Sequence, residues 1–178
     1  LPAIKIGSGE CSNYPLLKRI GSYDKPVILS TGMNDIVSIK KAINNLSLEE
    51  SKLALLHTTN LYPTPHDHVR LSAMIDLNKN FPSHIYGLSD HTIDSTSSLG
   101  AVALGASIIE RHFTDHKSRS GPDICCSMDE EDAKKLVIDL DKMRLCLSPG
   151  AKKQAHPNEQ VTINFAFASV VSFADIKP

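Results

Sequence analysis

Short apolar runs alternate along the chain with longer segments in which apolar residues recur every three or four positions. Five of these runs predict strands, over residues 3–6, 26–29, 52–57, 84–88 and 107–110. They recur at roughly 20 to 30 residues, which is the length of a βα unit. The alternation therefore predicts an α/β protein with parallel strands.

Two of the intervening segments carry helix start signals. Asn34 is placed to cap a helix with an isoleucine-rich face over residues 36–46. Further along, Ser127-Met128-Asp129-Glu130 has the spacing of a capping box ahead of an apolar stripe over residues 133–143. We expect these helices to cover the sheet.

The pattern changes near Ser148. Residues 148–164 contain proline, glycine and lysine and predict a linker. An aromatic and β-branched run over 165–171 predicts a strand that would open a second domain over 165–178. The first domain, residues 1–147, is either part of an eight-stranded barrel, which needs about 250 residues, or an open five-stranded sheet.

Composition limits the range of partners. The 178 residues are 41% hydrophobic and 22% charged, with a formal net charge of -1, which favours a small-molecule partner over nucleic acid or an anionic membrane. No apolar run approaches the roughly 20 residues of a membrane span, and the start of the chain lacks a signal-peptide pattern. We expect a cytoplasmic protein whose cysteines, which lack zinc-site spacing, are reduced thiols.

Polar side chains follow every predicted strand. Because ligands of parallel α/β proteins bind at the carboxyl ends of the strands, we expect these residues to converge on one place. They are Lys5, Gly7 and Ser8; Ser30 and Thr31; Thr58, Asn60 and Tyr62; Ser89, Asp90 and His91; Glu110 and His112.

His91 and His112 come from successive strand ends, where two imidazoles can bind one divalent ion and leave positions open for substrate and water. Two isolated histidines are more often exposed or hydrogen-bonded than ligating. The acidic neighbours Asp90 and Glu110 favour a functional site.

A second set of residues is suited to holding a phosphate. Lys5 is the most informative member, because a lysine inside an apolar strand is costly to bury unless an anion meets it. The serines are also ordinary turn residues. The set comprises Lys5, Ser8, Ser30 and Ser89.

Two loops carry further polar candidates. Asn60 and Tyr62, in a stiff proline-rich loop, are suited to hydrogen-bonding a polar substrate. Arg119 and Asp123, on the long loop after the last strand, contact either ligand or solvent.

Six motifs, in this order, resemble those of the bacterial sialic acid synthase family, typified by N-acetylneuraminate synthase. They are Lys5-Ile6-Gly7-Ser8-Gly9-Glu10, Leu29-Ser30-Thr31-Gly32-Met33, Asn60-Leu61-Tyr62-Pro63-Thr64-Pro65, Gly87-Leu88-Ser89-Asp90-His91-Thr92, Glu110-Arg111-His112-Phe113-Thr114 and Gly121-Pro122-Asp123-Ile124.

The resemblance implies a (β/α)8 TIM barrel, here incomplete, with residues 1–147 supplying about strands four to eight and a linker leading to a small antifreeze-like (SAF) domain. The implied reaction condenses phosphoenolpyruvate (PEP) with N-acetylmannosamine, by C–O cleavage of PEP, to give N-acetylneuraminate and phosphate in sialic acid and surface polysaccharide biosynthesis. It also implies assistance by Mn²⁺ or Mg²⁺ and a domain-swapped homodimer for the full-length protein.

The family's functional residues carry over onto matching positions. His91 and His112 would hold the metal and, with Glu110, form the catalytic set. The residues that would bind PEP are Lys5, Ser8, Ser30, Asn60 and Ser89. Those that would contact the sugar are Tyr62, Glu110 and Asp123.

Two functional groups of the family have no match in this sequence: a proposed catalytic glutamate on the first barrel strand and an arginine from the partner's antifreeze-like domain. We therefore expect the isolated chain to be inactive. A legionaminic or pseudaminic acid synthase is an alternative, although Asn60, Tyr62 and the 121–123 loop favour the N-acetylneuraminate branch. A metal aldolase would leave the phosphate set unused, and retention of both histidines disfavours a non-catalytic structural homologue.

Overall fold

The computed structural model describes residues 1–148 and 150–175. Its sheet contains five parallel strands in the order β1-β2-β3-β4-β5. The strands are β1 (Ile4–Ile6), β2 (Val27–Ser30), β3 (Leu53–Thr58), β4 (Ile85–Asp90) and β5 (Ile108–Arg111). The five predicted strands are confirmed, each within two residues of its expected ends.

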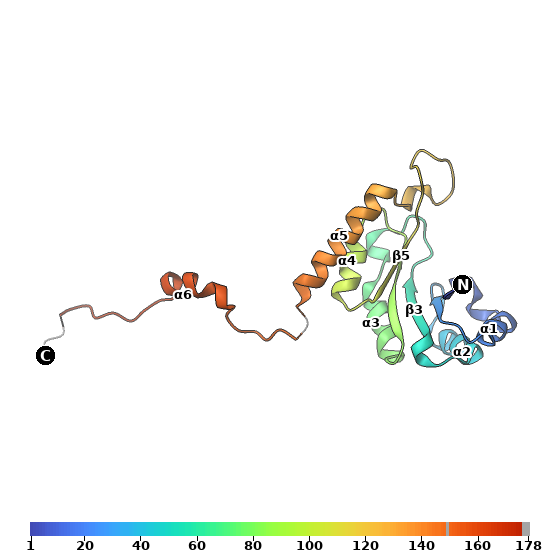
Figure 1. The fold of residues 1–178 in the computed structure, drawn as a ribbon, viewed down its shortest axis with the longest axis horizontal. Coiled ribbons are helices and arrows are strands. Elements are labelled where there is room, and N and C mark those ends of the chain that lie inside the picture. Colours follow the sequence, from blue (N-terminus) through green and yellow to red (C-terminus); the bar gives the residue numbers. More distant parts are fainter. Residues whose placement is uncertain (149, 176–178) are drawn as a thin grey trace. The chain divides into compact units, whose positions relative to one another are not determined.

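Helices follow the strands along the chain, as the alternating pattern predicts. Figure 1 shows α1 and α2 beside the amino-terminal strands, α3 and α4 beside the later ones, and α5 next to α4. The helices are α1 (Tyr14–Gly21), α2 (Ile36–Leu46), α3 (Leu71–Asn80), α4 (Thr96–Ala103) and α5 (Glu130–Leu147).

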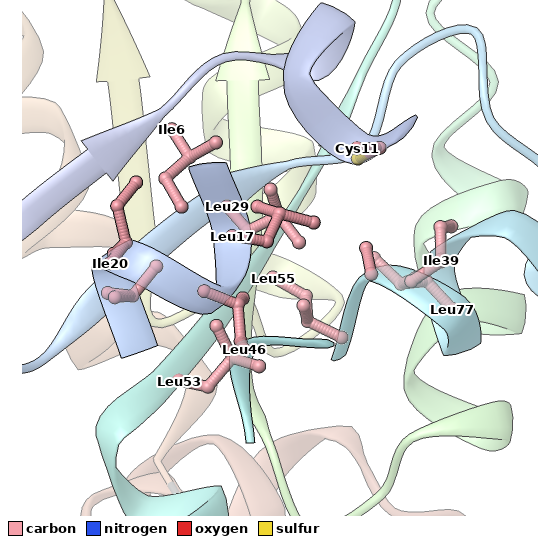
Figure 2. Close-up of a cluster of buried hydrophobic side chains, with 12 residues drawn as sticks. Ile6, Cys11, Leu17, Ile20, Leu29, Ile39, Leu46, Leu53, Leu55 and Leu77 are labelled. Atoms are coloured by element: carbon pink, nitrogen blue, oxygen red, sulfur yellow. The ribbon is translucent and has the colours of Figure 1, made fainter. Parts of the chain in front are cut away.

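The two faces of the sheet differ in chemistry. Alternate residues of a strand point to opposite faces, and the register aligns Ile6, Leu29 and Leu55 on one of them. Figure 2 shows these three side chains in a buried cluster with Leu17 of α1 and Leu46 of α2. Burying each such side chain contributes about 1.5 to 3 kcal/mol, so the helix-facing side of the sheet is the core.

The opposite face is concave. β1 and β5 are the two edges of the sheet, yet Lys5 Nζ lies 3.4 Å from Glu110 Oε1. In a flat sheet, four strand spacings would hold these edges about 19 Å apart, beyond the combined reach of a lysine and a glutamate. The sheet must therefore curve, with the polar ends of its strands inside, as in part of a barrel wall.

The start of α2 differs from the expected cap. Asp35 caps the helix, accepting a hydrogen bond from Ser38 N at 2.7 Å. Asn34 instead donates through Nδ2 to Ser8 O at 3.0 Å. The predicted Asn34 cap is wrong because this side chain ties the β2–α2 loop to the end of β1.

The capping box predicted for α5 is displaced by two residues. Asp129 Oδ1 accepts from Asp132 N at 2.9 Å, and Asp129 N donates back to Asp132 Oδ2. Ser127 Oγ donates instead to Asp123 O at 2.8 Å. The hydroxyl therefore stabilises the loop before the helix rather than the helix itself.

Residues 148–178 form a unit separate from residues 1–147. A 3-10 turn over Pro157–Glu159 leads into α6 (Gln160–Ala166). The strand expected over 165–171 is wrong, because α6 continues to Ala166 and no strand follows in residues 167–175. His156 and Glu159 make a reciprocal capping box, a helix start signal that lies within the expected linker. Pro149 and the expected domain end at 176–178 lie outside the described residues.

Two expectations about the chain as a whole concern membranes and thiols. Across residues 1–148 and 150–175, no helix combines the length and apolarity needed to cross a bilayer. The four cysteines are free, and burial raises the pKa of Cys11 to about 11. This thiol is therefore unreactive at neutral pH.

Candidate active site

Four side chains on the concave face form a polar network. Lys5 Nζ donates to Ser30 Oγ at 2.8 Å and lies 3.4 Å from Glu110 Oε1, to which Ser89 Oγ donates at 2.8 Å. The side chains of Lys5 and Glu110 are each 37% exposed, so a ligand on this face can reach them. A cation beside two hydroxyls is suited to binding an anion.

Ser8 and Asn60 meet at Gly32. Ser8 Oγ accepts a hydrogen bond from Gly32 N at 3.0 Å. A Cβ atom at position 32 would lie 1.8 Å from Asn60 Oδ1 and 3.0 Å from Ser8 Oγ, so only glycine permits this approach. Within the described residues Asn60 Oδ1 is buried without a hydrogen-bond partner. A buried amide atom of this kind is a candidate ligand contact.

Three rings gather at the ends of β4 and β5. The ring centroids of His91 and His112 are 5.1 Å apart, and the rings are perpendicular. The Tyr62 ring lies 4.2 Å from His91 and 5.6 Å from His112. The sequence placed these residues at separate strand ends, and the structure brings them together.

Hydrogen bonding selects the tautomer of His91. Its Nδ1–H donates to Thr59 O at 2.8 Å, which leaves Nε2 with a free lone pair when the ring is neutral. Burial lowers the pKa of His91 and outweighs the opposing effect of the Thr59 carbonyl. The neutral ring, the form that binds a metal ion, is therefore favoured.

Asp123 joins this group from the loop before a 3-10 turn (Ile124–Cys126). Its Oδ2 lies 3.7 Å from His112 Nδ1. Burial, followed by the charge of Asp123, raises the pKa of Tyr62, so the phenol stays neutral. With Asn60 Nδ2 at 3.4 Å from the Tyr62 hydroxyl, this part of the site offers a hydroxyl, an amide and a carboxylate to a polar ligand.

The histidine pair is a partial set of metal ligands. In the part of the chain that the structure describes, no cluster of three or more His, Cys, Asp or Glu side chains is arranged around a metal position. His91 and His112 fit a divalent ion as two neighbouring nitrogen donors, the remaining positions falling to water or substrate.

Arg119 and a second strand-end residue, His57, lie outside this group. Arg119 pairs with Asp115 on the exposed 115–119 loop. His57 faces the helix layer, where its Nε2–H donates to Val69 O at 2.7 Å. The Val69 contact gives His57 a structural role, whereas the Arg119 side chain is exposed to solvent.

Sequence reasoning missed Thr59 and Arg111. Arg111 is almost fully buried and pairs with Asp90, with 2.8 Å between Nη1 and Oδ2. The signal that singled out Lys5, a basic residue inside an apolar strand, resembles that at Arg111, which directly follows the predicted apolar strand over 107–110. Thr59 acts through its backbone carbonyl, which no side-chain pattern reveals.

Known proteins resemble this chain in sequence and in fold. The profile of the NeuB family matches residues 1–152. The chain belongs to the NeuB family. This NeuB chain is 42% identical over 180 residues to N,N'-diacetyllegionaminic acid synthase of Campylobacter jejuni, a match that covers 99% of the chain and 53% of that protein.

Two further NeuB relatives extend the comparison. N-acetylneuraminate-9-phosphate synthase of Drosophila melanogaster is 36% identical over 151 residues, covering 84% of this chain and 40% of that protein. The crystal structure of N-acetylneuraminic acid (sialic acid) synthetase from Leptospira borgpetersenii, in complex with citrate, superposes with a TM-score of 0.82 at 31% identity, covering 93% and 57% of the two chains. The NeuB chain thus spans about half the length of these relatives, and its fold matches that of the Leptospira borgpetersenii structure.

Proposed function

We propose that the complete protein condenses PEP with N-acetylmannosamine and one water to give N-acetylneuraminate and phosphate. The observation that carries the proposal is the polar network of Lys5, Ser30, Ser89 and Glu110, which adjoins the histidine pair on one concave face. The relatives named as nonulosonic acid synthases support the reaction class.

In this proposal PEP occupies the face around Lys5. The Lys5 ammonium would offset the charge of the phosphate or carboxylate, and Ser30 and Ser89 would donate hydrogen bonds to it. Ser8 and Asn60, which meet at Gly32, would complete the pocket. Because Glu110 is paired with Lys5 in the structure, the arriving anion would have to displace the carboxylate or share the lysine with it.

The amino sugar would lie on the other side, against Tyr62, Glu110 and Asp123. The neutral Tyr62 phenol and the Asp123 carboxylate can hydrogen-bond sugar hydroxyls and the acetamido N–H. His91 and His112 would hold Mn²⁺ or Mg²⁺, which supplies Lewis acidity toward the sugar aldehyde when bound. The hydrogen bond from His91 to Thr59 fixes the ring in the orientation and tautomer that this role needs.

A second candidate function is N,N'-diacetyllegionaminic acid synthesis, and one observation favours it. The Campylobacter jejuni relative of that name is 42% identical over 99% of the chain. Both candidate reactions would use PEP in the same way. The sugar substrates would differ, because the diacetamido sugar carries a second acetamido group, which would lie near Tyr62 and Asp123.

One assay separates these candidates. Phosphate release from PEP by the full-length protein is measured with N-acetylmannosamine and with diacetamido sugars, each with added Mn²⁺ and with chelator. We expect release with N-acetylmannosamine that the chelator abolishes. Release only with a diacetamido sugar would transfer the proposal to legionaminic or pseudaminic acid synthesis. Absence of release with every sugar would favour a non-catalytic barrel.

A further inference from the structure

The ends of β4 and β5 carry a buried ion pair on the face opposite the proposed site. Asp90 and Arg111 are direct partners in the sheet register, and their side chains are 1% and 3% exposed. Ser97 and Ser98 of α4 each donate to Asp90 Oδ2 at 2.6 Å, and Thr92 N donates to Oδ1 at 2.9 Å. The carboxylate therefore has four donors, including Arg111, around it.

Arg111 also binds the backbone of the loop after β4. Its Nη2 donates to Thr92 O at 2.5 Å, and its Nη1 donates to Asp94 O. A single guanidinium therefore holds the carboxylate at the end of β4 and the peptide groups that follow. A lysine cannot reproduce this, because it lacks the fixed fork of donors.

The ion pair is adjacent in sequence to both histidines. Asp90 precedes His91, and Arg111 precedes His112. Strand alternation puts the pair on the helix side and the histidines on the concave side, in agreement with the contacts of Asp90 to α4 and of His91 to Tyr62. The ion pair between Asp90 and Arg111 therefore fixes the backbone positions from which the two imidazoles extend.

We propose that the Asp90–Arg111 pair is a positioning device that sets the separation of His91 and His112. The proposal has two parts. The geometric part, that the pair sets the 5.1 Å between the two ring centroids, stands on the contacts above. The functional part, that this separation affects metal binding, rests on the proposed function. Neither side chain of the pair lies on the concave face.

The test compares Asp90→Asn, Arg111→Met and Arg111→Lys in the full-length protein. Mn²⁺ affinity is measured by calorimetric titration of the metal-free protein, and crystal structures of the metal-free variants give the ring separation. Loss of groups that support metal ligands typically weakens metal binding about 10- to 100-fold, and we expect that loss for Asp90→Asn and Arg111→Met. Arg111→Lys, the milder variant if the others fail to fold, should lose less.

A matched control separates positioning from general destabilisation. Leu46→Ala removes a buried side chain from the cluster in Figure 2, which contains no residue of α4 or β5. At a comparable loss in Tm it should leave both Mn²⁺ affinity and ring separation unchanged. An unchanged ring separation in Asp90→Asn and Arg111→Met would overturn the proposal, as would equal effects in Leu46→Ala. If the wild-type protein binds no Mn²⁺, the metal role in the proposed function fails, while the ring separations still decide the positioning claim.

Discussion

At residue 32 the loop after β2 runs so close to Asn60 that the site has no space for a side chain. Gly32 touches both the Ser8 hydroxyl and the Asn60 amide, two groups that follow different strands and meet in the proposed PEP pocket. The placement of each group therefore depends on the missing Cβ as much as on its own hydrogen bonds.

Gly32→Ala should lower both stability and affinity for PEP. The new Cβ must displace Asn60 Oδ1, which would lie 1.8 Å away, and overpacking of this kind costs about 1 to 3 kcal/mol. Denaturant unfolding measures the change in stability, and steady-state kinetics measures the KM for PEP.

Gly9→Ala is the stability control, since nothing lies within 4 Å of its added Cβ. Equal stability of the two variants would contradict the prediction, and an Asn60→Ala substitution should relieve part of the Gly32→Ala loss.

Lys5 is the positive charge at the centre of the network on the concave face. Replacing it with methionine removes the cation but keeps most of the length of the side chain. Hydrogen bonds to charged groups contribute about 1.5 to 3 kcal/mol, so Lys5→Met should raise the KM for PEP about 10- to 100-fold. Lys25→Met is the control, because Lys25 Nζ bonds the exposed Leu1 carbonyl instead. A KM for PEP that Lys5→Met leaves unchanged would remove Lys5 from the PEP pocket.

At the scale of elements, the strands were easier to predict than the helix starts. A buried parallel strand is marked by a continuous apolar run such as Leu53 to Leu56, and this signal is local. A helix cap depends on which of several neighbouring polar side chains turns toward the helix. Asn34 and Asp35 are both good caps in sequence, and only the packing of Asn34 onto Ser8 decides between them.

β3 carries a buried histidine whose titration should appear in the stability of the fold. Burial lowers the pKa of His57, against the opposing effect of the Val69 carbonyl. Because the folded state binds this proton less readily than the unfolded state, the stabilisation is complete above the unfolded pKa of about 6.5 and is lost as pH falls through the lower folded pKa. His57→Gln, which can still donate to Val69 O, should therefore weaken the loss of stability below pH 6.5.

Urea unfolding at several pH values between 8 and 5 measures this effect. Some pH dependence should persist in His57→Gln, because burial also lowers the pKa of His84 and of His91. Curves of equal slope for the wild type and His57→Gln would show that His57 does not contribute.

At the scale of the whole molecule, the convergence of most polar strand-end residues followed from the sequence. The position of Asp90 on the helix side did not, and neither did the contacts across the sheet. The parallel βα rhythm alone placed Lys5, Ser30, Ser89 and Glu110 at one edge. That Lys5 would meet Glu110 depends on the curvature of the sheet, which is a property of all five strands together. The strand expected over 165–171 fails for a related reason. β-branched and aromatic residues favour a strand only where a neighbouring surface packs against them, and the local sequence does not reveal whether such a surface is present.

The curved sheet also bears on activity. Both of its edges, β1 and β5, have one side without a partner strand among the described residues, and the site lies on the face between them. We propose that further barrel strands and an antifreeze-like domain from a partner subunit complete the site, so the 178-residue chain alone should release no phosphate from PEP and N-acetylmannosamine. Circular dichroism must first show that the isolated chain is folded. The Campylobacter jejuni relative, assayed with a diacetamido sugar, is the positive control. If the folded 178-residue chain released phosphate at a rate near that of the full-length protein, the five strands would suffice for activity.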